Sequence, residues 1–168
     1  MDFDGCATLL ARHSPTHNLV PHSLRNLQMT HIGITGTRDG MTDKQEDELY
    51  VFFAGCGAGT VFHHGDCVGV DVQAAKIAKD EFKFWTVCHP PIKTALRGYH
   101  NSDEFREEKD YLARNRDIVN ESIMLLVVPS KDYRYSRSGT WYTHDYAAKK
   151  GKPRRMLWPT KTDSQIIG

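Results

Sequence analysis

The sequence predicts an α/β protein with a Rossmann-like fold, in which helices cover both faces of a mainly parallel five-stranded sheet and so form three layers. Two observations predict this fold. Short β-branched or apolar runs alternate with segments of helical periodicity, and a glycine follows most of these runs. Such alternation implies parallel strands joined by right-handed crossovers. We expect the strand order 3-2-1-4-5, with a ligand site outside the carboxyl ends of the strands where the order changes direction.

Three strands and two helices are expected in the first part of the domain. The strands comprise residues 31–35, 60–64 and 82–88. Thr42 and Gln45 have the spacing of a capping box, which predicts the start of the first helix. The second helix is expected over residues 69–80, where apolar residues recur on one side. Pro90 and Pro91 end the third strand, because proline cannot donate to a strand ladder.

Two further strands and two helices are expected in the second part. Asn101 and Glu104 form another capping-box pattern, so a long helix is predicted from Asn101 to about residue 120. Its apolar stripe, at seven-residue spacing, comprises Phe105, Leu112 and Val119. Residues 123–128 are continuously apolar, as in a central strand that is covered on both faces. The last helix is expected over residues 139–150, and the last strand over residues 154–158.

The length of 168 residues suits one domain and is hardly enough for two. We expect the nucleotide-binding domain to cover residues 30–160, with an N-terminal extension of residues 1–29 and a C-terminal tail of residues 161–168. A formal net charge of +1 gives no reason to expect nucleic acid as a partner. The four cysteines do not form a disulfide framework, and neither a signal peptide nor a long apolar run is recognisable. These features predict a cytoplasmic protein that does not contact a membrane.

Glycine-bearing loops follow the first, second and fourth expected strands, and all three lie at the same edge of the predicted sheet. Each loop leads into a helix N-terminus, whose free N–H groups and dipole favour an anion. Three such loops side by side predict a cradle for a phosphate or a pyrophosphate. The candidate ligand-binding residues are Gly36, Thr37, Arg38, His64, Gly65, Asp66, Gly69, Asp71, Arg114, Asn115, Arg116, Ser138, Gly139 and Thr140.

Several of these residues allow two interpretations. Asp71, in the first turn of its helix, either complements the helix dipole or accepts a hydrogen bond from a ribose hydroxyl. Arg38 either clamps a phosphate or lies in solvent, and its place after a central strand favours the clamp. Within the long helix, Arg114 is expected to point nearly away from the apolar stripe, whereas Asn115 and Arg116 flank it.

The cysteines and histidines do not show the paired spacing of a structural zinc site, so neither a metal nor a cofactor is predicted. The residues concerned are Cys56, His63, His64, Cys67, Cys88 and His89. His63 and His64 are consecutive in a strand, so they should point to opposite faces of the sheet. A cysteine nucleophile has no better support, because a pairing of cysteine with histidine in space cannot be assigned from the sequence alone.

The loop motifs occur in the order of a known family. They are Gly36-Thr37-Arg38, His64-Gly65-Asp66-Cys67-Val68-Gly69-Val70-Asp71 running into Ala74-Ala75, Arg114-Asn115, Ser138-Gly139-Thr140 and Gly151-Lys152-Pro153. On these motifs the chain resembles the SLOG superfamily, from about residue 31 to residue 158. This Rossmann-like group includes the DNA-processing protein DprA and the LONELY GUY phosphoribohydrolases. The chain looks most like the small stand-alone members that are related to YpsA and YspA.

The resemblance implies binding of a nucleotide or a nucleotide-derived ligand, and a tendency to form homodimers or larger homo-oligomers. The phosphoribohydrolase branch carries the motif Pro-Gly-Gly-x-Gly-Thr-x-x-Glu, whose glutamate is essential for catalysis. Here Gly139 and Thr140 match that motif, but the glutamate position falls on Thr143. Cleavage of an N-glycosidic bond needs a carboxylate, and Asp66 and Asp145 are the candidate catalytic replacements.

Three functions are therefore compatible with the sequence. The first is a sensor or carrier that binds a nucleotide-like ligand without turnover. The second is an N-glycoside hydrolase that acts on nucleoside monophosphates, with Asp66 or Asp145 as its carboxylate. The third is binding of single-stranded DNA in the manner of DprA, which the nearly neutral charge supports least.

Overall fold

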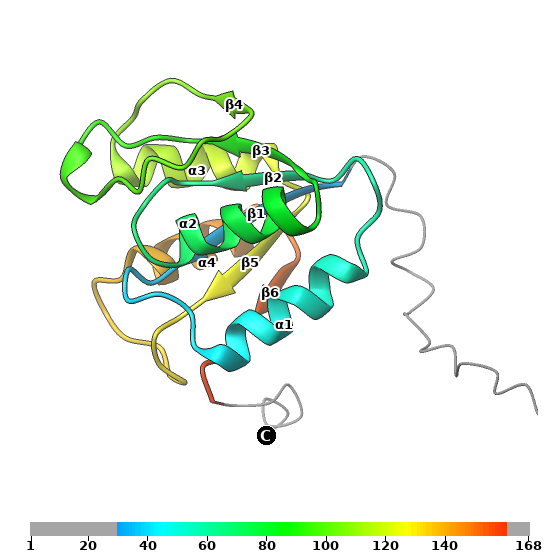
Figure 1. Cartoon of the computed structure of the whole chain (residues 1–168). Helices are drawn as coiled ribbons and strands as arrows, with labels where there is room; N and C mark the ends of the chain where they lie inside the picture. Colours follow the sequence, from blue (N-terminus) through cyan, green and yellow to red (C-terminus); the bar gives the residue numbers. More distant parts are fainter. Residues whose placement is uncertain (1–29, 161–168) are drawn as a thin grey trace, which may run out of the picture.

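The computed structural model describes residues 30–160, which form a six-stranded sheet with helices on both faces (Figure 1). The strands are β1 (His31–Gly36), β2 (Val61–His64), β3 (Trp85–Cys88), β4 (Glu104–Phe105), β5 (Met124–Val128) and β6 (Arg154–Met156). The helices are α1 (Asp43–Ala54), α2 (Val70–Lys76), α3 (Tyr111–Glu121) and α4 (Gly139–Lys149), with a π-helical turn η2 (Ile77–Glu81) and a 3-10 turn η3 (Thr94–Leu96). The expected extension and tail lie outside the described residues. Within residues 30–160, no helix has the length and apolar character needed to cross a membrane.

All neighbouring strands of the sheet run parallel, in the order β4-β3-β2-β1-β5-β6. The five predicted strands are therefore present in the predicted order. The predicted number of strands is wrong, because β4 adds a sixth strand beside β3. Strands β2, β3 and β4 follow one another outward on one side of β1, and β5 and β6 lie on the other side. The order changes direction between β1 and β5.

Strand β4 lies in the segment that is expected to open the long helix. It pairs with the end of β3, and the Asp103 carboxylate beside it accepts hydrogen bonds from the Thr86 backbone N–H (2.9 Å) and hydroxyl (2.7 Å). These bonds hold the segment extended along the sheet edge, so α3 begins only at Tyr111. The helix predicted to start at Asn101 is wrong there, because pairing with β3 overrides a local capping pattern.

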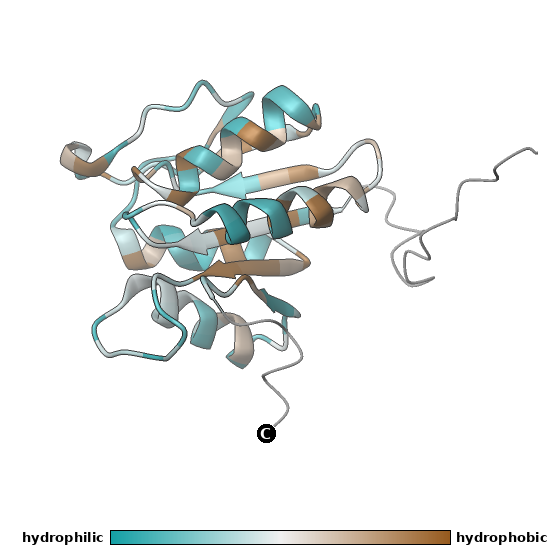
Figure 2. Cartoon of the chain, turned by 60° about the horizontal axis from the view of Figure 1, so that its bottom comes forward, coloured by the Kyte–Doolittle hydropathy of each residue, from teal (hydrophilic) through white to brown (hydrophobic). Residues whose placement is uncertain are grey.

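Two apolar layers enclose the sheet. Helices α1 and α2 cover one face, where Phe53 packs edge-on against Phe62 and Phe84 with ring centroids 5.3 and 5.1 Å apart. Helices α3 and α4 cover the other face through residues such as Ile118 and Ala147 (Figure 1). Four consecutive residues of β5 are buried, as its continuous apolar run predicts, and Figure 2 shows this strand brown along its length.

The predicted capping box at the start of α1 is confirmed. The Thr42 hydroxyl accepts from the Gln45 backbone N–H, and the Gln45 side chain accepts from the Thr42 backbone N–H at 3.0 Å. The buried Gln45 amide also donates to the carbonyls of Pro129 and Leu157, each at 2.8 Å. Gln45 thus ties α1 to the segments that follow β5 and β6, beside the edge where the loops gather.

Candidate functional site

A cavity of about 340 Å³ opens where the carboxyl ends of β1 and β5 meet the first turns of α3 and α4. This is the switch point of the sheet, where the sequence predicts the ligand site. The predicted residues that line it are Gly36, Thr37, Arg38, Asp71, Arg114, Asn115, Ser138, Gly139 and Thr140. The lining residues that were not predicted are Thr35, Asp39, Cys67, Tyr111, Leu112, Tyr135 and Arg137. We refer to this cavity as the switch-point pocket.

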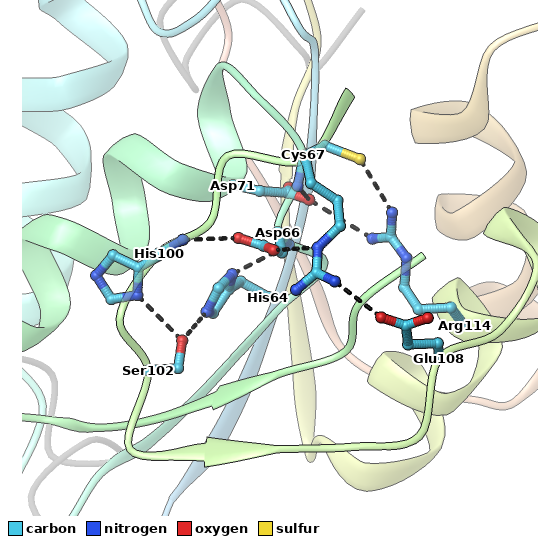
Figure 3. Close-up of polar contacts among 9 residues, drawn as sticks. His64, Asp66, Cys67, Asp71, His100, Ser102, Glu108 and Arg114 are labelled. Atoms are coloured by element: carbon cyan, nitrogen blue, oxygen red, sulfur yellow. Dashed lines mark hydrogen bonds and ion pairs between the residues drawn. The ribbon is translucent and has the colours of Figure 1, made fainter. Parts of the chain in front are cut away.

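Arg114 is the most deeply placed cation of this pocket, with only 4% of its surface exposed. Its Nη2 donates to the sulfur of Cys67 at 3.1 Å, and its Nη1 lies 3.5 Å from an Asp71 carboxylate oxygen (Figure 3). Its Nε–H is buried and has no hydrogen-bond partner among residues 30–160. A buried N–H without a partner costs free energy, so Arg114 retains capacity to bind an acceptor.

The inner side of α3 differs from the predicted stripe. Arg114, Ile118 and Val119 are the buried residues of α3, whereas Leu112 is 45% exposed. Phe105, which is expected to anchor the stripe, lies in β4 and is also exposed. The expectation that Arg114 points away from the sheet is therefore wrong: the helix starts later, and its buried side runs through Arg114.

The environment of Asp71 and Cys67 explains their ionisation. Burial raises the pKa of the Asp71 carboxyl, and the positive charge of Arg114 opposes this rise. Burial also raises the pKa of the Cys67 thiol, with the negative charge of Asp71 adding to the effect. Cys67 is therefore a protonated thiol at neutral pH, and its sulfur accepts a hydrogen bond from Arg114. This argues against Cys67 as a nucleophile, since the thiolate is the reactive form.

Tyr111 contacts two arginines that line the pocket. The guanidinium of Arg38 lies 5.5 Å from the centroid of the Tyr111 ring, and that of Arg114 lies 5.7 Å from it. Both distances are within the range of a cation–π contact. The ring therefore holds two positive charges on the same pocket, where an anion would be attracted to both.

The N-terminus of α4 forms the opposite wall. Ser138 is the N-cap, and its hydroxyl accepts from the Trp141 backbone N–H at 3.4 Å. The next residue, Gly139, has no atom within 4 Å of the position that a Cβ would take, so its backbone faces open space. Because α4 has 11 residues, its dipole and free N–H groups favour an anion at this end.

Thr143 occupies the position at which the phosphoribohydrolase motif has its glutamate. It is buried, its hydroxyl donates to the Gly139 carbonyl at 2.7 Å, and it accepts from the Asn115 amide at 2.7 Å. Both hydrogen-bonding roles of the hydroxyl are used within the protein. Thr143 thus orients Asn115 at the pocket wall and connects α3 to α4.

The loop after β2 contributes less to the pocket than the sequence predicts. The predicted ligand residues that do not line it are His64, Gly65, Asp66, Gly69 and Arg116. Gly69 has a φ of +88°, and a Cβ there would lie 2.4 Å from the Arg38 carbonyl oxygen. The Val70 N–H donates to the Thr37 carbonyl at 3.1 Å. The loop after β2 therefore packs against the loop after β1. Arg116, the remaining predicted residue, is exposed on α3.

Asp66, a candidate catalytic residue, is completely buried. One of its carboxylate oxygens accepts from Arg97 Nε at 2.9 Å, and the other accepts from the His100 backbone N–H at 2.9 Å (Figure 3). Next to it, His64 shares a hydrogen bond of 2.8 Å with the Ser102 hydroxyl. These contacts fasten the segment between β3 and β4 to the end of β2.

Asp145, the other candidate catalytic residue, lies in a neighbouring hollow of about 720 Å³. It is paired with Arg134, whose Nη1 donates to Asp145 Oδ1 at 2.8 Å, and this hydrogen bonding lowers the pKa of Asp145 to about 2. The hollow shares Tyr135 and Gly139 with the switch-point pocket. Its other lining residues include Trp141 and Tyr142.

Replacing Asp66 by asparagine is expected to lower the free energy of unfolding by roughly 3 kcal/mol, because it removes the buried carboxylate beside the largely buried Arg97 and leaves that guanidinium paired with the exposed Glu108. The matched variant Asp145→Asn should cost less than about 1 kcal/mol, because both partners of that pair are exposed to water. Urea unfolding of the two variants checks this difference. An Asp66→Asn protein as stable as the wild type but altered in its chemistry would instead favour a catalytic role.

The fold and the switch-point pocket define a Rossmann-like α/β domain with a cavity at the carboxyl edge of its sheet. No family model matches the chain. No curated protein matches it either. Solved structures do match, among them two DNA processing proteins of the group that the motifs resemble, and this likeness shows a shared fold.

Three of these structures illustrate the likeness. DNA processing protein A from Helicobacter pylori, which has a single-stranded DNA binding mode, is 21% identical, with a TM-score of 0.57 over 81% of this chain and 68% of that chain. The molybdenum cofactor binding protein from Rippkaea orientalis is 22% identical, with a TM-score of 0.58 over 77% of each chain. DprA from Streptococcus pneumoniae is 16% identical, with a TM-score of 0.57 over 76% of this chain and 50% of that chain. At these identities the likeness concerns the fold alone.

Proposed function

We propose that the protein binds a nucleotide or a nucleotide-derived ligand in the switch-point pocket and acts as a sensor or carrier of that ligand. The observation that carries this proposal is Arg114, a buried arginine with an unpaired N–H, which lines the pocket together with Asp71 and the first residues of α4. A buried positive charge beside a helix N-terminus suits a phosphate, and a buried carboxylate suits a ribose hydroxyl.

The pocket and the adjoining hollow suggest how such a ligand lies. The phosphate would lie between Arg38, Arg114 and the first turn of α4, and the ribose would lie near Asp71. The base extends over the hollow, whose lining includes the partly exposed aromatic residues Tyr135 and Tyr142 as candidates for stacking. The two spaces share several residues, so one extended ligand can occupy both.

Binding without cleavage is the form of this function that the pocket supports best. Among residues 30–160, the carboxylates that line it are Asp39 and Asp71. Asp39 accepts from the Thr37 hydroxyl at 3.0 Å, and Asp71 faces Arg114. Thr143 supplies no carboxylate at the position used by the phosphoribohydrolases. Incubation with AMP and CMP should therefore release no free base, and chromatographic detection of adenine or cytosine would establish the hydrolase instead.

Calorimetric titration with AMP, ADP-ribose, NAD and cyclic nucleotides tests the proposal directly. At least one compound of this panel should bind with one site per chain. If no compound of the panel binds, the proposal is overturned. Single-stranded oligonucleotides form the other arm, because two similar structures are DNA-processing proteins. Oligonucleotide binding whose affinity falls steeply with salt would favour DNA as the partner.

Replacing Gly139 by alanine is expected to weaken binding of the titrated ligand at least about tenfold without loss of stability. The added methyl group meets no protein atom, so it can only obstruct a ligand that approaches the α4 N-terminus. Gly151→Ala is the matched control, since it also meets no atom but has a φ of +66° and lies outside the pocket. That variant should lose stability and keep its affinity. Equal ligand affinity in both variants would remove the α4 N-terminus from the site.

A further inference from the structure

A row of three histidines crosses the sheet on the face covered by α3. His31 lies on β1, His63 on β2 and His89 directly after β3. His31 Nδ1 is 2.8 Å from His63 Nε2, and His63 Nδ1 is 3.0 Å from His89 Nε2. Glu121, the last residue of α3, places a carboxylate oxygen 3.8 Å from His63 Nδ1. His64 bonds to Ser102 on the opposite side of the strand, as strand alternation predicts.

We propose that His63, His89 and Glu121 form a binding site for one divalent metal ion with the ligand preferences of zinc. Two imidazoles and one carboxylate are an established zinc ligand set that leaves one position for water. In a tetrahedral site with ligand distances of about 2.0–2.1 Å, neighbouring ligand atoms lie about 3.3 Å apart. The observed separations of 3.0 and 3.8 Å bracket this value. The three ligand atoms lie within 4.8 Å of one another, so small side-chain rotations suffice.

The surroundings of the three ligands fit this role. His63 and His89 are buried, whereas the Glu121 side chain is 34% exposed and leaves an approach for the ion and a water molecule. His31 contacts the other ring nitrogen of His63, which is the outer-shell contact that orients metal-binding histidines. Burial lowers the pKa of His63 to about 3 and that of His89 to about 4, so both rings are neutral at pH 7 and keep a lone pair for a metal.

Arg106 is the group that competes with a metal for Glu121. Its Nε donates to Glu121 Oε2 at 2.8 Å, and its Nη1 pairs with Glu104. Because Glu104 can keep Arg106 paired, Glu121 can turn to an ion without leaving the arginine alone. Arg106 is also one of the charges that disfavour a further positive charge on His63 and His89. Its removal should therefore strengthen metal binding.

The test is a zinc titration of the full chain, purified without a polyhistidine tag and treated with a chelator, monitored by competition with a zinc indicator. The wild type should bind one zinc ion at this site, and Glu121→Gln should weaken that binding at least about tenfold. Arg106→Ala should tighten it, although it removes two ion pairs and should lower thermal stability slightly. Glu108→Gln, which changes an exposed glutamate paired with another arginine, should leave zinc affinity unchanged.

Three of the nine histidines lie in residues 1–29, so zinc could also bind there, and the variants decide between the sites. X-ray absorption at the zinc edge should show two imidazole nitrogens at about 2.0 Å in the wild type. Zinc affinity that is equal in the wild type and Glu121→Gln, or weaker in Arg106→Ala, overturns the proposal. So does the absence of zinc binding. Neither result bears on the nucleotide pocket, because none of the three ligands lines it.

Discussion

Replacing Gly65 by alanine is expected to lower ligand affinity more than about a hundredfold and the free energy of unfolding by roughly 3 kcal/mol. A Cβ at this position would lie 1.2 Å from Nη1 of Arg114 and 2.8 Å from an Asp71 carboxylate oxygen. The guanidinium must therefore leave its place, and the buried Asp71 then loses its counter-charge. Gly65 does not line the switch-point pocket, so the loss of affinity would report on the displaced Arg114 and on Asp71 beside it.

A double-mutant cycle with Arg114→Ala separates this mechanism from general damage. If alanine at position 65 acts by displacing Arg114, the two substitutions together should cost little more than either one, in both affinity and urea unfolding. Additive effects would show that Gly65 acts through the backbone of its loop instead. Its backbone conformation is one that alanine can adopt, since its φ lies outside the left-handed region.

The arrangement of the sheet follows from features that are local in the sequence. The Thr42–Gln45 capping box, the continuous apolar run of β5 and the alternation of elements together specify five of the strands and their order. The sixth strand could not be predicted in this way. Glu104–Phe105 is too short to show strand periodicity, and its pairing depends on the Asp103–Thr86 contact between distant parts of the chain.

The composition of the candidate site was harder to predict than its position. The motifs indicate most of the pocket lining, but the direction of Arg114 depends on which side of α3 is buried, and the predicted stripe includes Phe105, which lies in β4. Arg137 and Tyr135 lie in a loop without periodicity, where only the fold brings them to the pocket. Asp66 shows the opposite case. Its glycine-rich loop favours ligand contact, whereas the structure pairs it with Arg97 from a segment 31 residues away.

Acidification is expected to unfold the protein at a higher pH than carboxylate titration alone would, because three histidines are buried in the folded state. Burial is the main cause that lowers the pKa of His63 to about 3, that of His89 to about 4, and that of His64 well below its usual value. The unfolded chain binds protons at these sites from a pKa of about 6.5. Between these values the unfolded state holds more protons, so stability is fully present above pH 6.5 and falls as the pH falls.

Below pH 6.5, each such histidine should lower the free energy of unfolding by about 1.4 kcal/mol per pH unit. His63 and His89 together should therefore lower it by roughly 4 kcal/mol at pH 5. That is a large part of the stability of a domain of this size. Urea unfolding between pH 7 and pH 5, with a chelator present to exclude bound metal, measures the slope. His89→Gln keeps a hydrogen-bonding side chain beside His63 but cannot take up a proton, so its slope should be smaller by about 1.4 kcal/mol per unit. A slope unchanged in that variant, or a flat profile in the wild type, would show that these histidines already carry protons in the folded protein.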